Sequence, residues 1–381
     1  MNTLEIAFVR QKYNPYGGAE RFVERALQAL ATNKVNMTVL SRRWDATNSD
    51  YQFLACHPFY LGRLWRDWGF AREVCQQLKT LNVEIVQSHE RIPCIDIYRA
   101  GDGVHKVWLQ QKARASGVLP ALIDRFSPYH SYTLRAEKTM FESPRLQAVI
   151  CNSVMVRDEI IEHFDITPEK LHVIYSGVDT TLFRPERRSE QRDALRRELN
   201  IAKHDPVLLM VGSGYFRKGL DAVLQAMSTL RAPPMLVVVG YDKHADRYLK
   251  LARSVGLQER VVFAGAQLDV LPYYAMADAF VLPSLYDPFP NAALEAMACG
   301  LPVVTSNKTG AAEFIDNGVQ GYVVDAFDYA QLAGAIVDVS DQERAAQMGI
   351  KAREKLESFG LDVMADKLVD LYHKVVEDKH R

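Results

Sequence analysis

The chain has 381 residues, of which 48% are hydrophobic and 24% are charged, a composition typical of a globular protein with two or three domains. Its 46 lysines and arginines balance 47 aspartates and glutamates, so the overall charge gives no reason to expect nucleic acid or another polyanion as a partner. The five cysteines form no C-x-x-C pair, which argues against a disulfide framework and fits a reducing, cytoplasmic compartment.

Short apolar runs alternate with helical patterns along most of the chain. The first run contains Glu5 and begins near the N-terminus, a pattern unlike a signal peptide, and no run approaches the ~20 apolar residues of a membrane span. Such alternation predicts parallel sheets with helices on both faces. The predicted strands are 4–9, 35–40, 83–87, 148–151, 171–174, 207–211, 235–239, 261–263, 279–282 and 302–305.

The strands form two sets, which predicts an α/β protein with two doubly wound, Rossmann-like domains. We expect an N-terminal domain (1–180), a C-terminal domain (181–360) and a terminal helix (361–381) that can pack back on the first domain. Ligands of open parallel sheets bind at the carboxyl ends of the strands, so facing domains would surround one cleft with strand-end loops.

Three loops of the first half carry candidate side chains. Gly17 and Gly18 precede a helical pattern and allow close approach of backbone to an anion, although an ordinary turn explains them equally. His89 and Arg91 follow the strand 83–87 and can recognise an acceptor or pair with local carboxylates. Asp102 lies between two glycines, with His105 just after it, and is either a turn residue or a catalytic acid.

The segment 106–145 has more basic than acidic residues, and aromatic and aliphatic residues lie between them in the sequence. Lys112, Arg114 and Arg125 are among its cations, and Trp108 and Phe126 are among its apolar residues. This pattern favours contact with an anionic membrane surface, such as the inner leaflet. Two ordinary helices with a hydrated face remain the alternative.

In the second half, the loop 212–219 follows a strand and contains Gly214, Arg217 and Lys218. Two cations at a predicted helix start oppose the helix dipole, so we expect an anion such as a diphosphate to join them. Solvated basic residues are the plainer alternative.

The stretch 283–300 reads as the end of a strand, a proline-rich turn and a helix with Asn291 as its N-cap. Asp287 and Glu295 are carboxylates able to accept hydrogen bonds from hydroxyl groups, and a helix N-terminus favours a phosphate. A surface turn before an amphipathic helix is the alternative. The sequence has no D-x-D, H-E-x-x-H or cysteine–histidine cluster, so we expect no metal and no other cofactor.

Taken together, these segments resemble the retaining glycosyltransferases of family 4, which have the GT-B fold. The resemblance rests on the glycine loop 17–21, the segment 212–218 with Arg217 and Lys218, the E-x7-E region 283–300 and CGLPVV at 299–304. GSGYFRKGLD, GYDK and SHERIP…YRAGD are most similar to lipopolysaccharide-core glucosyltransferases. This chain departs from the family pattern at two positions. Asp287 stands where the E-x7-E motif begins with glutamate, and Pro290 stands where the family has glycine. Proline lacks the backbone N–H that a ligand oxygen can use.

The resemblance implies a metal-independent hexosyltransferase that uses a nucleoside-diphosphate sugar, with uridine as the expected base, and a glycolipid or oligosaccharide acceptor. It also implies that the domain 1–180 binds the acceptor and that the domain 181–360 binds the nucleotide sugar. It implies catalytic roles for Asp102 and Asp287, and acceptor contacts from His89, Arg91 and His105. The implied donor-binding residues are Gly17, Gly18, Gly214, Arg217, Lys218, Asp287, Phe289, Pro290, Asn291, Ala292 and Glu295. Two alternatives remain: a nucleotide-sugar epimerase of the same fold and a non-catalytic, membrane-associated sugar-binding protein.

Overall fold

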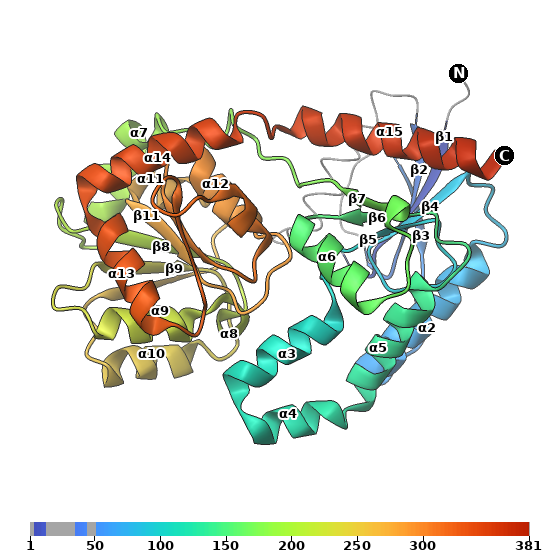
Figure 1. Cartoon of the computed structure of the whole chain (residues 1–381), viewed down its shortest axis with the longest axis horizontal. Coiled ribbons are helices and arrows are strands. Elements are labelled where there is room, and N and C mark those ends of the chain that lie inside the picture. The colour runs from blue at the N-terminus through green and yellow to red at the C-terminus, as the bar shows by residue number, and fades with distance from the viewer. Residues whose placement is uncertain (1–3, 13–34, 44–50, 381) are drawn as a thin grey trace. The chain divides into compact units, whose positions relative to one another are not determined.

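The computed structural model describes residues 4–12, 35–43 and 51–380. These residues form two compact units. The first contains the described residues up to Ser176 together with helix α15 (Leu361–His380), and the second is Gly177–Gly360. Each unit has its own parallel sheet with helical connections (Figure 1). The predicted fold class, two Rossmann-like parallel sheets, is therefore confirmed.

Seven parallel strands make up the described part of the first sheet, in the order β3-β2-β1-β4-β5-β6-β7. Two of them, β3 and β5, were not predicted. The residues of β3 are mostly exposed at the edge of the sheet, and β5 is only three residues long, so neither gives a sustained apolar pattern. The strands are β1 Leu4–Val9, β2 Val35–Ser41, β3 Gln52–Ala55, β4 Ile85–Ser88, β5 Ile97–Arg99, β6 Ala148–Cys151 and β7 Leu171–Val173.

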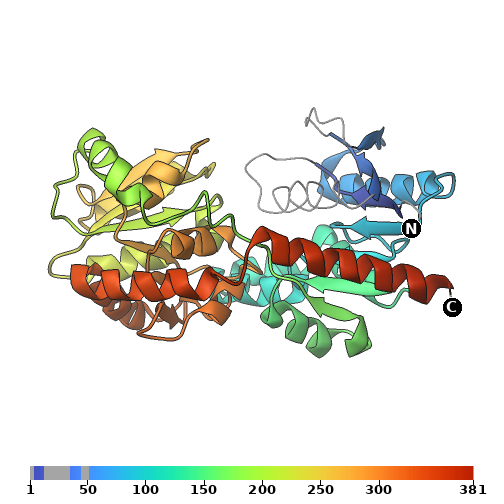
Figure 2. The ribbon, with the colours of Figure 1, turned by 90° about the horizontal axis from the view of Figure 1, so that it is seen from above.

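Helix α15 lies along this first sheet and completes its core (Figures 1 and 2). Leu368, Leu371 and Tyr372 are buried in one cluster with strand residues such as Ile6 and Ile85. The Tyr372 hydroxyl donates to Gln87 Oε1 at 2.7 Å, and the Lys379 ammonium lies 3.2 Å from Asp96 Oδ1. The end of the chain is thus an integral part of the first unit.

The remaining described helices of the first unit include a run of three between β5 and β6. They are α2 Gly62–Gln77, α3 His105–Ser116, α4 Val118–Arg125, α5 Pro128–Phe141, α6 Val154–His163 and the short 3-10 helix η1 Pro168–Lys170.

One prediction about the cysteines is wrong. Cys75 near the end of α2 and Cys94 between β4 and β5 form a disulfide, with their Cα atoms 5.8 Å apart. The fold brings together two residues that are 19 positions apart, which sequence spacing alone did not reveal. Cys56, Cys151 and Cys299 are free and buried. The cysteine pattern therefore gives no support to a reducing compartment.

Six parallel strands form the sheet of the second unit in the order β10-β9-β8-β11-β12-β13. The bounds of β8, β9 and β11 match the predicted apolar runs, whereas β13 was missed because it is short and begins with glycine. The strands are β8 Val207–Val211, β9 Met235–Val239, β10 Val261–Gly265, β11 Ala279–Leu282, β12 Val303–Ser306 and β13 Gly321–Val324.

A charged segment near the start of the second unit forms helix α7 (Arg187–Glu198). Arg192 and Arg196 on α7 donate to opposite oxygens of the buried Asp278 carboxylate at 2.6 and 2.7 Å, which fixes α7 beside β11. The helices are α7 Arg187–Glu198, α8 Tyr215–Lys218, α9 Leu220–Ser228, α10 Ala245–Ser254, α11 Leu271–Met276, α12 Asn291–Ala298, η2 Gly310–Phe314, α13 Tyr329–Ser340 and α14 Gln342–Leu356.

Among the residues that the structure describes, no helix combines the length and the apolar character needed to cross a bilayer.

Candidate active site

The strand order of the second sheet places two of the predicted loops next to each other. β8 pairs with β11, although other strands separate them in the sequence, and the loops 212–219 and 283–290 follow these two strands. In open parallel sheets, such a reversal of strand order leaves a crevice at the carboxyl ends, where ligands bind. The Leu285 amide donates to the carbonyl oxygen of Arg217 at 2.8 Å, which joins the two loops directly.

Two glycines allow the loop after β8 to approach its neighbours this closely. Gly219 has a φ of +79°, and a Cβ atom there would lie 2.1 Å from the carbonyl oxygen of Pro283. A Cβ atom at Gly212 would lie 2.9 Å from Cε of Lys218. A larger residue at either position would therefore displace the neighbouring loop or the lysine.

Arg217 and Lys218 were predicted to lie at the start of a helix, and the structure places them differently. They form the last turn of the short helix α8, and α9 begins only at Leu220. Both side chains already have an anionic partner: Arg217 Nη1 lies 3.1 Å from Asp287 Oδ2, and Lys218 Nζ donates to the same oxygen. A carboxylate from the neighbouring loop thus supplies the anion that sequence reasoning expected only from a ligand.

This charged group is largely removed from water. The side chains of Lys218 and Asp287 are only 10% and 9% exposed, whereas the Arg217 side chain is 38% exposed. Burial lowers the pKa of Lys218, and Asp287 opposes that effect. Burial alone would raise the pKa of Asp287, but Lys218 and Arg217 outweigh it and hold the pKa below the ordinary value. Asp287 is therefore ionised at neutral pH.

Glu295 lies on α12 and is buried, and its carboxylate is held from a neighbouring helix. The Tyr274 hydroxyl on α11 lies 3.0 Å from Glu295 Oε2 and 3.2 Å from the carbonyl oxygen of Ala292. Sequence reasoning missed Tyr274, because nothing in the local pattern of α11 indicates which side chain faces α12. We interpret it as the residue that orients Glu295.

The start of α12 differs by one residue from the prediction. Asn291 is the first helical residue, and Pro290, which has no side-chain cap, occupies the N-cap position. Phe289 is buried and packs edge to face on Phe314, with ring centroids 5.9 Å apart. Asn291 and Ala292 are half-buried in the first turn. In this segment, the backbone and the two half-buried residues are thus better placed for a ligand than the Phe289 ring.

The predicted glycines fall into two groups. Gly214 is the N-cap of α8, with a left-handed φ of +78°. Gly17 and Gly18 lie outside the described residues.

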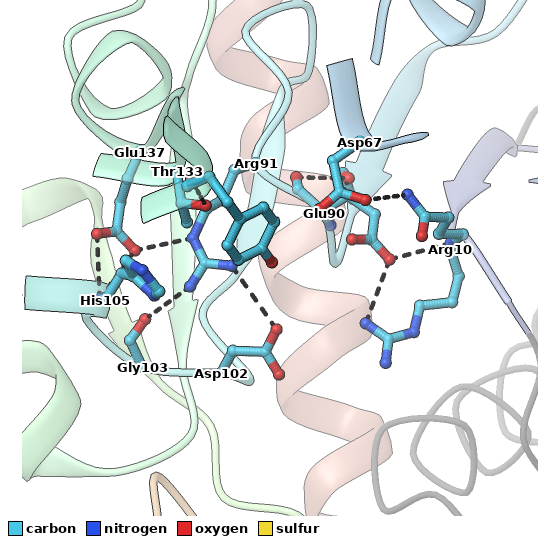
Figure 3. A network of polar contacts seen from close by, with 12 residues as sticks. Arg10, Asp67, Glu90, Arg91, Asp102, Gly103, His105, Thr133 and Glu137 are labelled. Carbon is cyan, nitrogen blue, oxygen red and sulfur yellow. Dashed lines mark hydrogen bonds and ion pairs between the residues drawn. The ribbon is translucent and has the colours of Figure 1, made fainter. Parts of the chain in front are cut away.

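In the first unit, the Arg91 side chain contacts residues of two other segments (Figure 3). Its Nε donates to Glu137 Oε1 at 2.9 Å, its Nη2 lies 3.4 Å from the carbonyl oxygen of Gly103, and its Nη1 lies 3.7 Å from Asp102 Oδ2. Glu137 on α5 also accepts the amide of His105 at 3.1 Å. The structure thus brings together Arg91, Asp102 and His105, as well as Glu137, which was not among the predicted site residues.

Asp102 is the accessible member of this group. Its side chain is 57% exposed, whereas the side chains of Arg91 and Glu137 are 16% and 1% exposed. The turn that presents Asp102 ends at Gly103, whose φ of +67° favours glycine. Burial would lower the pKa of Arg91, but Tyr98 and Glu137 outweigh it and raise the pKa well above the ordinary value. Arg91 is therefore a fixed cation beside an accessible carboxylate.

The two predicted acceptor histidines differ in their surroundings. His105 Nε2 lies 3.0 Å from Nδ1 of His130, and burial, together with Arg91 and His130, lowers the pKa of His105 to about 3. His89 is buried next to Gln87, and burial lowers its pKa well below the ordinary value. Both imidazoles are neutral at neutral pH. His89 is enclosed, whereas Arg91 and His105 are only partly buried.

Helix α4 presents an unusual apolar surface. None of its residues is buried, and Val118, Leu119, Ile123 and the adjoining Phe126 are 73–84% exposed. Figure 1 shows that α4, the middle of the three helices between β5 and β6, lies away from the strands of its own sheet. By contrast, α5 buries Thr133, Glu137, Met140 and Phe141. The alternative of two ordinary helices thus describes α5 but not α4.

The described residues contain no group of three or more His, Cys, Asp or Glu side chains arranged to hold a metal ion.

Two family models together match most of the chain. The model described as "Glycosyltransferase Family 4" matches residues 16–182, and the model described as "Glycosyl transferases group 1" matches residues 191–355. The chain is 25% identical to the lipopolysaccharide glucosyltransferase WaaG of Escherichia coli K12, over 86% of this chain and 87% of that protein. It is 30% identical to a D-inositol 3-phosphate glycosyltransferase of Rhodococcus opacus, but that match spans 62% of this chain and only 54% of the relative.

Solved structures show the same fold. The crystal structure of WaaG superposes with a TM-score of 0.80 at 23% identity and covers 96% of this chain and 99% of that one. The structure of Anabaena Alr3699/HepE in complex with UDP-glucose gives a TM-score of 0.74 at 20% identity, with 97% and 100% of the two chains covered. The predicted GT-B fold is therefore confirmed.

Proposed function

The chain belongs to glycosyltransferase family 4, and we propose that it transfers a hexose from a UDP-linked donor to a lipopolysaccharide-core or other cell-envelope glycolipid. Enzymes of this family take their sugar from a nucleotide sugar and retain its anomeric configuration. The observation that carries the proposal is the convergence of Arg217, Lys218 and Asp287 at the carboxyl ends of β8 and β11. The likeness to WaaG supports the acceptor class, and the likeness to HepE supports the donor.

In this proposal the second unit (181–360 in the sequence-based division) binds the donor. Arg217 and Lys218 hold the diphosphate, Glu295 holds the ribose, and Asp287 accepts hydrogen bonds from hydroxyls of the transferred sugar. Backbone from Phe289 to Ala292, at the start of α12, contacts sugar and phosphate. The Tyr274 hydroxyl at 3.0 Å keeps the Glu295 carboxylate directed at one position.

The chemistry follows from where charge develops. As the bond between the anomeric carbon and the diphosphate breaks, negative charge grows on the leaving oxygen. Cations that are already fixed in a water-poor site stabilise that charge without reorganising. Lys218 is buried and Arg217 lies beside it, so the pair meets this requirement. The acceptor oxygen then attacks on the same face, assisted by the leaving phosphate.

Asp102 is our candidate for the group nearest to the acceptor in the first unit (1–180 in the same division). As a carboxylate it can take the acceptor's proton or stabilise positive charge at the anomeric carbon. Arg91, itself anchored by buried Glu137, holds Asp102 from one side, while more than half of the Asp102 side chain remains accessible. His105, neutral at pH 7, offers a hydrogen bond to an acceptor hydroxyl.

The α4 face suits an acceptor that is anchored in a bilayer. Exposed cations adjoin it in the chain: Arg114 lies in the last turn of α3, and Arg125 is the last residue of α4. An apolar face flanked by cations favours an anionic membrane surface. We therefore propose that the segment 106–145 holds a cytoplasmic enzyme at the inner leaflet, where a glycolipid acceptor would be found.

Replacing Leu119, Ile123 and Phe126 together with serine should strongly reduce co-sedimentation with phosphatidylglycerol-containing vesicles, because these side chains supply the exposed apolar area of α4. The matched control replaces Leu268, Val337 and Ile350, which are exposed apolar residues of the second unit, and should co-sediment like the parent. Equal binding of the α4 variant and the parent would show that α4 is not the membrane contact.

The experiment that tests the proposed function is a calorimetric screen of nucleoside diphosphates and their sugars, followed by turnover with glycolipid acceptors. We expect one nucleotide, UDP, to bind tightly, and sugar transfer to require an acceptor. If no nucleotide binds, the donor site is wrongly assigned. If the donor sugar is isomerised in the absence of any acceptor, the enzyme is an epimerase.

A further inference from the structure

The cations of the candidate donor site are neutralised from within the protein. Asp287 Oδ2 accepts hydrogen bonds from Lys218 Nζ and from Arg217 Nη1, the latter at 3.1 Å. The Lys218 and Asp287 side chains are both about one-tenth exposed, so solvent screens their pairing only weakly. Before a donor arrives, a carboxylate thus occupies the hydrogen bonds that a diphosphate would use.

The backbone holds Asp287 in this position. Its amide donates to the carbonyl oxygen of Lys308 at 2.9 Å, and its carbonyl accepts the amide of Gly310 at 3.0 Å. On the other side, Arg217 Nη1 donates to the carbonyl oxygen of Tyr286 at 3.2 Å, which keeps the guanidinium next to the residue before Asp287. The carboxylate is therefore presented to the cations by the fold and does not meet them by chance rotation of an exposed side chain.

We propose that Asp287 is an internal counter-ion that makes the site prefer a sugar-bearing donor over a free nucleoside diphosphate. This inference rests on the proposed function. A diphosphate that takes over Lys218 and Arg217 brings its negative charge close to the Asp287 carboxylate, and like charges in a water-poor site repel each other. A donor sugar relieves this cost, because its hydroxyls donate to the displaced carboxylate.

After sugar transfer, Asp287 can replace the diphosphate as the partner of Lys218 and Arg217. Once the sugar has left, the carboxylate loses its hydroxyl partners and again competes for Lys218 and Arg217. The nucleoside diphosphate product is then released more easily than it would be from a site with two unopposed cations. Asp287 thus sets the balance between donor binding and product inhibition.

The test measures dissociation constants of UDP, UDP-glucose and inorganic pyrophosphate by calorimetry for the parent and for Asp287→Asn. We expect the variant to bind UDP and pyrophosphate at least tenfold more tightly. Its affinity for UDP-glucose should rise less, because the variant also loses an acceptor for the sugar hydroxyls. The preference for UDP-glucose over UDP should therefore shrink by the ratio of these two gains. Asp287→Ser, which also removes the charge, carries the same expectation if the asparagine variant does not fold.

Asp316→Asn is the matched control, because Asp316 is 70% exposed in the same unit and its replacement changes the net charge equally. It should leave all three dissociation constants unchanged. If the variants at position 287 bind UDP no more tightly than the parent, the counter-ion role is wrong while the donor site stands. If the parent binds none of the three probes, the proposed function itself fails.

Discussion

Replacing Lys218 with alanine is expected to weaken the binding of a nucleoside diphosphate by roughly 10- to 150-fold. The physical reason is the loss of a charge-assisted hydrogen bond to a largely buried anion, which is worth ~1.5–3 kcal/mol. Arg217 remains, but its side chain is 38% exposed and stays beside Asp287, so it cannot replace the buried ammonium. Calorimetry with UDP measures the effect.

Two controls separate this effect from a general loss of charge or of folding. Lys351→Ala removes a lysine that is 56% exposed in the same unit and should leave UDP affinity unchanged. Thermal unfolding of Lys218→Ala shows whether the variant is folded at the assay temperature, since the substitution leaves Asp287 with one cation fewer. A folded Lys218→Ala protein with parental affinity would remove Lys218 from the diphosphate site.

Replacing Asp102 with asparagine should lower turnover about 10²- to 10⁴-fold, the range usual for a group that moves a proton or stabilises charge in the transition state. Donor binding should not change, because the donor residues belong to the second unit. The fold should tolerate the change, since Asp102 is exposed and its partner Arg91 keeps its bond to Glu137 at 2.9 Å.

Asp158→Asn provides a matched comparison for this prediction. Asp158 belongs to the first unit, its side chain is also 57% exposed, and it also pairs with an arginine. The two variants should therefore have similar stability, and only Asp102→Asn should lose turnover with glycolipid acceptor. Equal turnover in both variants would exclude Asp102 from the chemistry.

If the Lys218→Ala and Asp102→Asn variants behave as expected, the charged residues of the two units have separate functions. Arg217 and Lys218 determine whether the donor binds, and Asp102 determines whether the bound donor reacts. Asp287 connects the two stages, because its carboxylate pairs with these cations and, in our proposed donor complex, accepts hydrogen bonds from sugar hydroxyls.

The amino-acid sequence alone determined much of the fold, because buried parallel strands need continuous apolar runs that are visible locally. Val207–Val211, Met235–Val239 and Ala279–Leu282 begin and end where the sequence predicts. The glycine loop with Arg217 and Lys218, and the terminal helix, were also evident, since glycine patterns and helical periodicity are properties of neighbouring residues. Gln52–Ala55 escaped prediction because an exposed edge strand has no such pattern.

Only the tertiary structure decided how these residues work together. Lys218 meets Asp287 across 69 positions, and Arg91 meets Glu137 across 46, because strand order and helix packing bring distant segments side by side. Whether two cations are balanced by a ligand or by the protein itself depends on what lies within a few ångströms of them in space. No local pattern contains that information, since Coulomb interactions and hydrogen bonds depend on distance through space rather than along the chain.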